Sequence, residues 1–310
     1  MDDSIAVIIP CYNEEAAIGG VVDAFRAALP QATIYVYDNN SSDDTSIVAK
    51  RHGALVRTER RQGKGNVVRR MFADVEADVY VLTDGDGTYD AACAGEMITL
   101  LREESLDMVV GVRKVVEDGG EAYRRGHAWG NRMFNRIFMA CFGNVFCDIL
   151  SGYRVFSRRF VKSFPALSSG FEVETEISIH AAQLMLPVAE FATPYRARPE
   201  GSSSKLSTYR DGWRILVTIV WLFKEASPLR FFSIAAALLA ATSLVLAAPV
   251  ILTWMETGLV PRLPTAVLST GLGILSAGSL GAGFVLDSVS RGKLEAKRLA
   301  YLGVGGRTSS

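Results

Sequence analysis

The sequence predicts an α/β protein with a mostly parallel, doubly wound sheet, followed by two apolar helices near the C-terminus. Short apolar or β-branched runs recur through the first half, and amphipathic stretches of helical length separate most of them. Polar motifs follow three of these runs, and two long uncharged stretches lie near the end. The predicted strands are residues 5–9, 33–37, 54–56, 79–82 and 108–110.

The polar motifs stand where the first, second and fourth predicted strands end. They read PCYNEE, DNNSSDDT and TDGDGTYD, and they begin at residues 10, 38 and 83. Ligands of open parallel sheets bind at the carboxyl ends of the strands. We therefore expect the three motifs to converge on one crevice.

The motif after the fourth strand holds two carboxylates, Asp84 and Asp86, in a glycine-rich turn. At this spacing they can face one point, where they would repel each other unless a cation intervenes. Mg²⁺ or Mn²⁺ would bind one or both and take its other oxygens from a diphosphate. The alternative is a turn that caps a helix beginning near Asp90.

Two further motifs suit a second phosphate. SGYR spans residues 151–154, and EGSSSKL spans residues 200–206. Hydroxyl and backbone N–H groups in such loops bind anions, and Lys or Arg adds charge-assisted hydrogen bonds. The residues predicted to bind this phosphate are Arg154, Ser203, Ser204 and Lys205. The alternatives are a strand-edge turn for SGYR and a surface loop for EGSSSKL.

Two other segments carry less specific signals. RRQGKGN, residues 60–66, also suits a phosphate through Lys64, or Lys64 is simply solvated. In FEVETE, one of Glu172, Glu174 and Glu176 could orient a sugar; the equal alternative is a row of acids on a solvated strand face.

The C-terminal part predicts a transmembrane hairpin. Residues 231–255 and 265–286 contain no charge, and each is long enough to cross about 30 Å of hydrocarbon. Basic residues flank the outer ends, so the N-terminal domain and the tail are predicted to be cytoplasmic. The alternative is a pair of buried core helices. Small residues in the second span favour close packing, either within the hairpin or between protomers of a homo-oligomer.

The predicted organisation has four parts: a catalytic domain at 1–208, an interfacial juxtamembrane helix at 209–228, the transmembrane hairpin at 229–290 and a cytoplasmic tail at 291–310. The helix is predicted to be interfacial because tryptophan and aliphatic residues gather on one side, with basic residues available to headgroups. A core helix of the catalytic domain is the alternative.

Composition excludes several classes. Lys and Arg total 33, as do Asp and Glu, so no basic excess indicates nucleic acid. The four cysteines show no CxxC spacing and the three histidines lie far apart, which indicates neither a zinc site nor a disulfide framework. The acidic N-terminus has no long apolar run, so we expect no cleaved signal peptide.

The order of these motifs, followed by a two-helix anchor, resembles the family-two glycosyltransferases of GT-A fold, most of all the polyprenyl-phosphate group that includes dolichol-phosphate mannose synthase. The resemblance covers essentially the whole chain. It implies that Pro10, Tyr12 and Glu14 surround the base and ribose and that Asp38 contacts the base. It also implies that Asp84 and Asp86 bind the metal. Mannose synthases commonly have Gln at the position of Thr88.

The resemblance implies inverting transfer of a sugar from a UDP- or GDP-linked nucleotide sugar to undecaprenyl or dolichyl phosphate, in cell-envelope or glycosylation pathways. Asp86, Asp148 and Arg154 are the predicted catalytic residues, although an ionised phosphate acceptor needs little help from a base such as Asp148. Lys64 joins the donor-binding set. The enzyme is expected in the cytoplasmic membrane. The alternatives are a glycosyltransferase with a hydroxyl acceptor, or a non-catalytic membrane scaffold or flippase.

Overall fold

The computed structural model describes residues 3–115, 139, 146–170, 172–196, 213, 216, 217, 220, 221 and 223–305. The chain forms two compact units. The first comprises Met1–Thr218 together with Lys297–Ser310, and the second comprises Ile219–Ala296.

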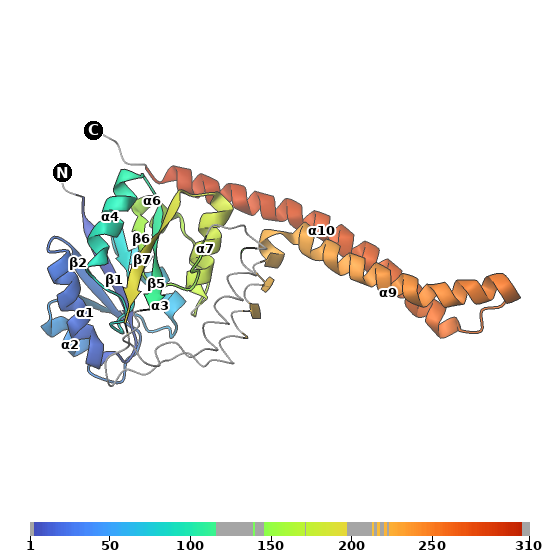
Figure 1. The fold of residues 1–310 in the computed structure, drawn as a ribbon, viewed down its shortest axis with the longest axis horizontal. Helices are drawn as coiled ribbons and strands as arrows, with labels where there is room; N and C mark the ends of the chain where they lie inside the picture. Colours follow the sequence, from blue (N-terminus) through green and yellow to red (C-terminus); the bar gives the residue numbers. More distant parts are fainter. Residues whose placement is uncertain are drawn as a thin grey trace. The chain divides into compact units, whose positions relative to one another are not determined.

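The first unit is built on a seven-stranded sheet with the order β3-β2-β1-β4-β6-β5-β7 (Figure 1). All strands run parallel except β6, which pairs antiparallel with both β4 and β5. The five predicted strands are confirmed, whereas β6 and β7 were not predicted. The strands are β1 (Ile5–Cys11), β2 (Thr33–Asp38), β3 (Leu55–Thr58), β4 (Val79–Leu82), β5 (Met108–Val115), β6 (Arg154–Ser157) and β7 (Val188–Tyr195).

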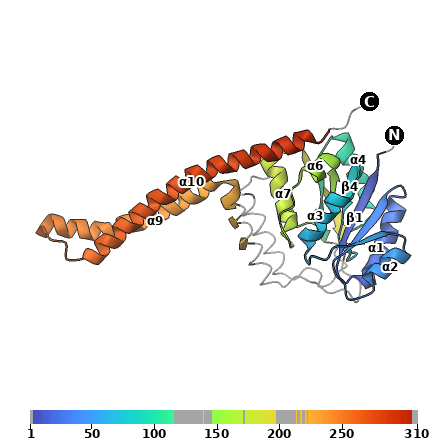
Figure 2. The same cartoon turned by 180° about the vertical axis from the view of Figure 1, so that it is seen from behind.

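Helices cover both faces of the sheet (Figures 1 and 2). One layer contains α1 (Glu15–Ala28), α2 (Thr45–Arg51) and α4 (Cys93–Glu103), with α1 contacting the other two. The other contains α3 (Lys64–Asp74), α6 (Arg158–Ser163) and α7 (Val173–Leu184), with α3 contacting the other two. This doubly wound arrangement is the predicted fold class.

The strand pleat divides the core between the two layers. Val7 and Ile9 of β1 join the cluster that includes α1 and α4. On the opposite side, Phe72 of α3 meets Tyr80 and Phe156 edge to face, at ring-centroid distances of 6.5 and 5.7 Å. Because alternate residues of a strand face opposite sides, each strand contributes to both clusters. The central strands are buried on both faces, which accounts for their uninterrupted apolar sequences.

Strand β1 lies between β2 and β4, so the strand order reverses direction at the β1–β4 pair. In doubly wound sheets this reversal opens a crevice at the carboxyl ends of the strands. The inserted β6 lies directly beside β4, with Leu82 opposite Arg154. This register places the SGYR segment next to the acidic motif that follows β4.

The FEVETE segment is not a strand. Val173–Leu184 forms α7, and Val173, Glu174 and Thr175 are buried. The alternative of acids alternating on a solvated strand face is therefore wrong. The alternating pattern of FEVETE resembles a strand, but nine of the twelve helix residues are buried, so tertiary packing sets the conformation here.

The second unit contains α9 (Pro228–Thr257) and most of α10 (Leu263–Gly303). Both helices are long and apolar enough to cross a membrane, and only 11% and 6% of their apolar windows are buried. Such exposure is unlike that of core helices, the alternative raised by the sequence. Ser276 Oγ and Ser279 Oγ of α10 donate to the carbonyl oxygens of Ala236 and Phe232 on α9, at 2.8 and 3.2 Å. The two helices therefore pack together as a hairpin.

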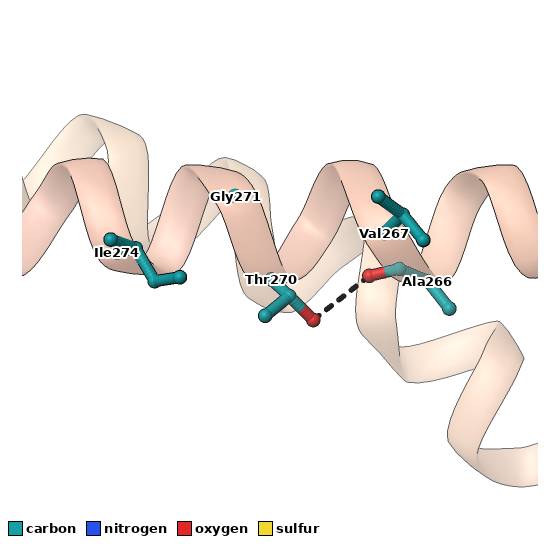
Figure 3. Close-up of a pocket in the computed structure, with 5 residues that line it drawn as sticks. All are labelled: Ala266, Val267, Thr270, Gly271 and Ile274. Atoms are coloured by element: carbon teal, nitrogen blue, oxygen red, sulfur yellow. Dashed lines mark hydrogen bonds between the residues drawn. The ribbon is translucent and has the colours of Figure 1, made fainter.

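The glycines of α10 divide between two environments. A Cβ on Gly283 would lie 3.0 Å from Phe232 of α9, so this glycine permits close packing within the hairpin. Gly271 and Gly278 have nothing within 4 Å of such a Cβ. Figure 3 shows a hollow on α10 lined by Ala266, Val267, Thr270, Gly271 and Ile274. Its lining has no charged side chain, so it does not suit the phosphates of a nucleotide.

Candidate active site

The first two predicted motifs lie side by side at the carboxyl ends of β1 and β2. The backbone N–H of Asn39 donates to Cys11 O at 2.9 Å. Asn13 N donates to Ser41 Oγ at 2.9 Å, and Ser42 N donates to Asn13 Oδ1 at 2.8 Å. Asn13 has a left-handed φ of 53°, a conformation that Asn tolerates better than most residues. Hydrogen bonds across the two loops thus form one wall of the expected crevice.

The residues predicted to contact the nucleotide lie on this wall. Pro10 is half-buried near the end of β1, and Tyr12 is exposed just after it. Glu14 immediately precedes α1, and its carbonyl oxygen accepts from Ile18 N at 2.9 Å. Asp38 is buried at the end of β2, and its carboxylate accepts from Ser41 N at 3.3 Å. The fold brings the four residues to one region, while their contacts with a base or ribose stay a prediction.

Asn39 ties this wall to the RRQGKGN segment, a role that the sequence analysis missed. Its side-chain amide donates to the carbonyl oxygens of Glu59 and Arg61, each at 2.8 Å. Its Oδ1 accepts from Gly63 N at 2.7 Å. Gly63 has a φ of 126°, which only glycine adopts readily, and it precedes Lys64 at the start of α3. The buried amide therefore sets where Lys64 enters the site.

Lys64 connects the acidic motif to α7. Its ammonium group is hydrogen-bonded to Asp84 Oδ1 and lies 2.5 Å from Glu174 Oε1. Burial by itself would lower the pKa of Lys64, but the charges of both carboxylates outweigh burial and raise it above its ordinary value. The Lys64 side chain is 11% exposed, so the alternative of a solvated lysine is wrong. Glu174 was one of three open candidates, and it is the one that reaches the site.

Asp84 and Asp86 differ in their surroundings. The Asp84 side chain is 27% exposed, whereas Asp86 is buried. Asp86 Oδ1 accepts from the backbone N–H and the hydroxyl of Thr88, at 3.2 and 2.7 Å. Among the described residues, no three His, Cys, Asp or Glu side chains gather as a metal site. A metal held here would therefore need oxygens from its substrate, as Mg²⁺ commonly does.

The backbone of SGYR closes against the acidic motif. A Cβ on Gly152 would lie 2.5 Å from Asp84 Oδ2, so any larger residue would force this carboxylate to shift. Gly152 N donates to the hydroxyl of Tyr89 at 2.9 Å, and the Tyr89 ring lies 5.3 Å from that of Tyr153. This cradle leaves Asp84 partly exposed, which suits binding of a cation by its carboxylate.

Arg154 is a buried structural residue, which corrects the expectation that it binds a lipid phosphate or acts in catalysis. It is 0% exposed. Its guanidinium group donates to Ser151 O and Ile149 O at 2.9 Å each and to Glu174 O at 3.2 Å. Burial lowers its pKa to about 10, so it stays charged near neutral pH. Arg154 holds the SGYR loop and the first turn of α7 together.

Asp148 is paired with Arg113. Arg113 Nε and one terminal nitrogen donate to the two carboxylate oxygens at 2.8 and 2.7 Å. Burial would raise the pKa of Asp148, but the hydrogen bonds and charge of Arg113 hold it below its ordinary value. A carboxylate fixed in this way is a weak base. Arg113 was not predicted because no local pattern marks it: its partner Asp148 lies 35 residues later, in the segment before β6.

Other predicted residues lie outside the described part of the chain. They are Ser203, Ser204 and Lys205. Within the predicted interfacial helix, the described residues 213, 216, 217, 220, 221 and 223–226 are helical. Trp213 and Trp221 are among its exposed apolar side chains.

Comparison with solved structures identifies the fold class. The sheet with an acidic motif at its switch point is the GT-A fold of glycosyltransferases. One such structure is glucosyl-3-phosphoglycerate synthase from Mycobacterium tuberculosis, solved with Mn²⁺, UDP-glucose and phosphoglyceric acid. It is 25% identical, has a TM-score of 0.57, and the match covers 70% of this chain and 79% of that one.

The family model described as Glycosyl transferase family 2 matches residues 6–164, and the chain belongs to this family. Glycosyltransferase AglJ of Haloferax volcanii is 35% identical over 82% of this chain and 83% of its own length. Dolichyl-phosphate hexose transferase of the same organism is 30% identical over 70% of this chain and 93% of its own length. The chain is therefore a glycosyltransferase of GT-A fold.

Proposed function

We propose that the protein transfers a sugar, with inversion, from a UDP- or GDP-linked nucleotide sugar to a membrane polyprenyl phosphate. The observation that carries the proposal is the presence, in one chain, of a partly exposed acidic site at the switch point and of two apolar helices that could span a membrane. A relative named dolichyl-phosphate hexose transferase supports a lipid phosphate as acceptor.

The donor half of the site has the groups that a nucleoside diphosphate requires. Asp84 and Asp86 would hold a Mg²⁺ or Mn²⁺ ion, which when bound neutralises the departing diphosphate. The cradle formed by Gly152 and the buried polar surroundings of Asp86 fit such an ion. Lys64 adds a positive charge beside Asp84, and the loops after β1 and β2 would bind the nucleoside. Mn²⁺ and UDP in related solved structures support this assignment.

The acceptor half needs no strong base. A phosphate monoester has a second pKa of about 6, so near neutral pH it is already largely a dianion. Its oxygen can attack the anomeric carbon in line with the departing diphosphate, which inverts the configuration. Asp148, paired with Arg113, is assigned to orientation of the loop before β6 rather than to proton transfer. Ser203, Ser204 and Lys205 are proposed to bind the lipid phosphate.

The membrane arrangement follows from the helices and their flanks. We infer a multi-pass protein of the cytoplasmic membrane, with the catalytic unit and the C-terminus in the cytoplasm, because basic residues flank the outer ends of the apolar segments. Reporter fusions after Ser310 test this topology. A periplasmic or luminal signal from the fusion would contradict it.

The central experiment incubates the purified full-length protein with undecaprenyl or dolichyl phosphate and a panel of UDP- and GDP-sugars. The expected result is a polyprenyl-phosphate sugar whose formation stops on chelation of divalent metal and resumes with Mg²⁺ or Mn²⁺. Transfer only to glycolipid or polysaccharide hydroxyls would instead support the alternative acceptor. No transfer to either class would favour a non-catalytic scaffold or flippase.

A variant separates the two halves of the site. Lys205→Ala is expected to raise the KM for lipid phosphate about 10-fold or more, because one charge-assisted hydrogen bond is lost. Calorimetry of nucleotide binding should change little. An equal loss of lipid-phosphate use and of nucleotide binding would assign Lys205 to the donor site.

A further inference from the structure

The ammonium group of Lys64 lies between two carboxylates that come from different elements. Asp84 follows β4, and Glu174 lies in the first turn of α7. The side chains of Lys64 and Glu174 are 11% and 6% exposed, whereas that of Asp84 is 27% exposed. The cluster thus contains one more carboxylate than ammonium groups in a buried environment, where unpaired charge is costly.

Lys64 and Glu174 are held together by the backbone. Gly63 and Gly65 lie so close to Ser169 O and Ser168 O that neither position has room for a Cβ. Gly65 N also donates to Gly170 O at 3.1 Å. The start of α3 is therefore tied to the loop that leads into α7. Asp84 is the partner that comes from a separate loop and is partly exposed.

Glu174 has an unused hydrogen-bonding atom. Its Oε2 is buried and has no hydrogen-bond partner, although Oε1 of the same carboxylate lies 2.5 Å from the Lys64 ammonium. An ammonium group has three donors, so Lys64 could bind both oxygens of Glu174 if it left Asp84. Such a shift would satisfy the buried oxygen and free the carboxylate that is proposed to bind metal.

We propose that Glu174 is a positioning residue that receives Lys64 when Asp84 binds the divalent ion of the donor. Without the ion, Lys64 neutralises Asp84; with the ion, Lys64 pairs with both oxygens of Glu174. The inference rests on the proposed function, because it requires a divalent ion at Asp84. It assigns Glu174 a role in exchanging one cation for another at the donor site.

The test measures Mn²⁺ affinity of the full-length protein by electron paramagnetic resonance, with and without UDP or GDP. Lys64→Met is expected to tighten Mn²⁺ binding about 10-fold, because the competing cation is gone. Glu174→Gln is expected to weaken it about 10-fold, because Lys64 then has only Asp84 as a charged partner. The two variants therefore shift affinity in opposite directions, which a merely structural role would not produce.

The double variant, Lys64→Met with Glu174→Gln, tests whether Glu174 acts by receiving Lys64 or only through its own negative charge. In the Lys64→Met background, Glu174→Gln should have no further effect, because no lysine remains to be received. An effect of equal size in both backgrounds would mean that Glu174 acts only as a distant charge, and it would overturn the proposal. Glu172→Gln, two residues earlier, is the matched control and should leave Mn²⁺ affinity unchanged.

The outcomes distinguish this inference from the proposed function. A wild-type protein that binds Mn²⁺ neither alone nor with nucleotide would overturn both the metal assignment and the exchange. Wild-type binding with both single variants weakened, or neither changed, would overturn the exchange alone. If Glu174→Gln does not fold, Lys64→Met decides by itself, since unchanged or weaker Mn²⁺ binding contradicts the proposal.

Discussion

Two ionic clusters of the first unit differ in how many of their polar atoms have hydrogen-bond partners. The donor cluster, defined as Lys64, Asp84 and Glu174, has a partly exposed acid and an unpaired carboxylate oxygen. The brace cluster is defined as Arg113, Asp148 and Arg154; Asp148 and Arg154 are buried and Arg113 is partly buried. Its arginines engage both Asp148 oxygens and three main-chain carbonyls. Buried charge is thus common to both clusters, and what distinguishes the donor cluster is a partly exposed acid together with a buried carboxylate oxygen that has no partner.

The largest expected effect comes from breaking the donor cluster. Asp84→Asn should lower the transfer rate at least about 100-fold, because several kcal/mol of charge stabilisation depend on the proposed metal ligand. The melting temperature should stay close to that of the wild type. Asp90→Asn, in the same loop, is the matched control and should keep near wild-type turnover. Comparable turnover of Asp84→Asn and wild type at saturating metal would remove Asp84 from the site.

Substitutions in the brace cluster should instead lower the stability of the fold. Arg154→Met is expected to lower the free energy of unfolding by about 3 kcal/mol or more, because it leaves buried carbonyl oxygens without donors. Denaturant unfolding measures this loss. Arg158→Met is the control: its partner Glu76 is 64% exposed, and such surface pairs contribute about 1 kcal/mol or less. A stable Arg154→Met protein with reduced lipid use would restore the phosphate-binding role.

Acid should weaken the brace cluster through Asp148. A carboxyl group whose pKa is lower in the folded protein than in the unfolded chain stabilises the fold above the unfolded pKa, and this contribution is lost as pH falls through the folded pKa. Arg113 lowers the pKa of Asp148, so its contribution should fade below about pH 4. Asp148→Asn should cost about 1–3 kcal/mol near neutral pH.

The measurement is denaturant unfolding of wild type and Asp148→Asn at several pH values. The difference between the two proteins should shrink in acid, because protonated Asp148 and Asn are both neutral. A difference that grows as pH falls would contradict the assigned pKa direction.

The smallest effect is expected at the contact of Tyr301 with Asp107 and Arg159, in which Tyr301 and Arg159 are half-buried and Asp107 is buried. Tyr301 Oη donates to Asp107 Oδ2 at 2.7 Å, and Arg159 donates to Tyr301 Oη at 3.1 Å. Tyr301→Phe should lower the free energy of unfolding by about 1 kcal/mol. Ser157 still donates to Asp107 in this variant, which limits the loss. A loss of stability as large as that of Arg154→Met would show that the exposure of the substituted side chain does not determine the size of the effect.

The sequence predicted the parts of the fold that repeat a local pattern. Strands such as Ile5–Cys11 carry uninterrupted apolar residues, and the convergence of their polar ends follows from parallel topology. β6 was missed because it is only four residues long and begins with Arg154, a charged residue that suggests solvent. Its burial depends on carbonyl oxygens of the preceding turn and of α7, which no local pattern reveals.

The candidate site was predicted unevenly for the same reason. Asp84 and Asp86 stood out because two acids in a glycine-rich turn form a local signal. Glu174 was only one of three open candidates, and Asn39 was not singled out. Each matters through partners far away in the sequence, Lys64 for the first and the 59–63 segment for the second. Long-range contacts of single side chains are what the sequence pattern could not supply.

The position of Gly152 beside Asp84 has a consequence for genetic screens. Its codon lies in a motif that sequence alone would assign to the acceptor, yet a single added methyl group there would press on Asp84 Oδ2. In a screen of randomly mutagenised genes, alleles that replace Gly152 should therefore have the same phenotype as alleles that replace Asp84. Second-site mutations that restore function are expected in the loop after β4.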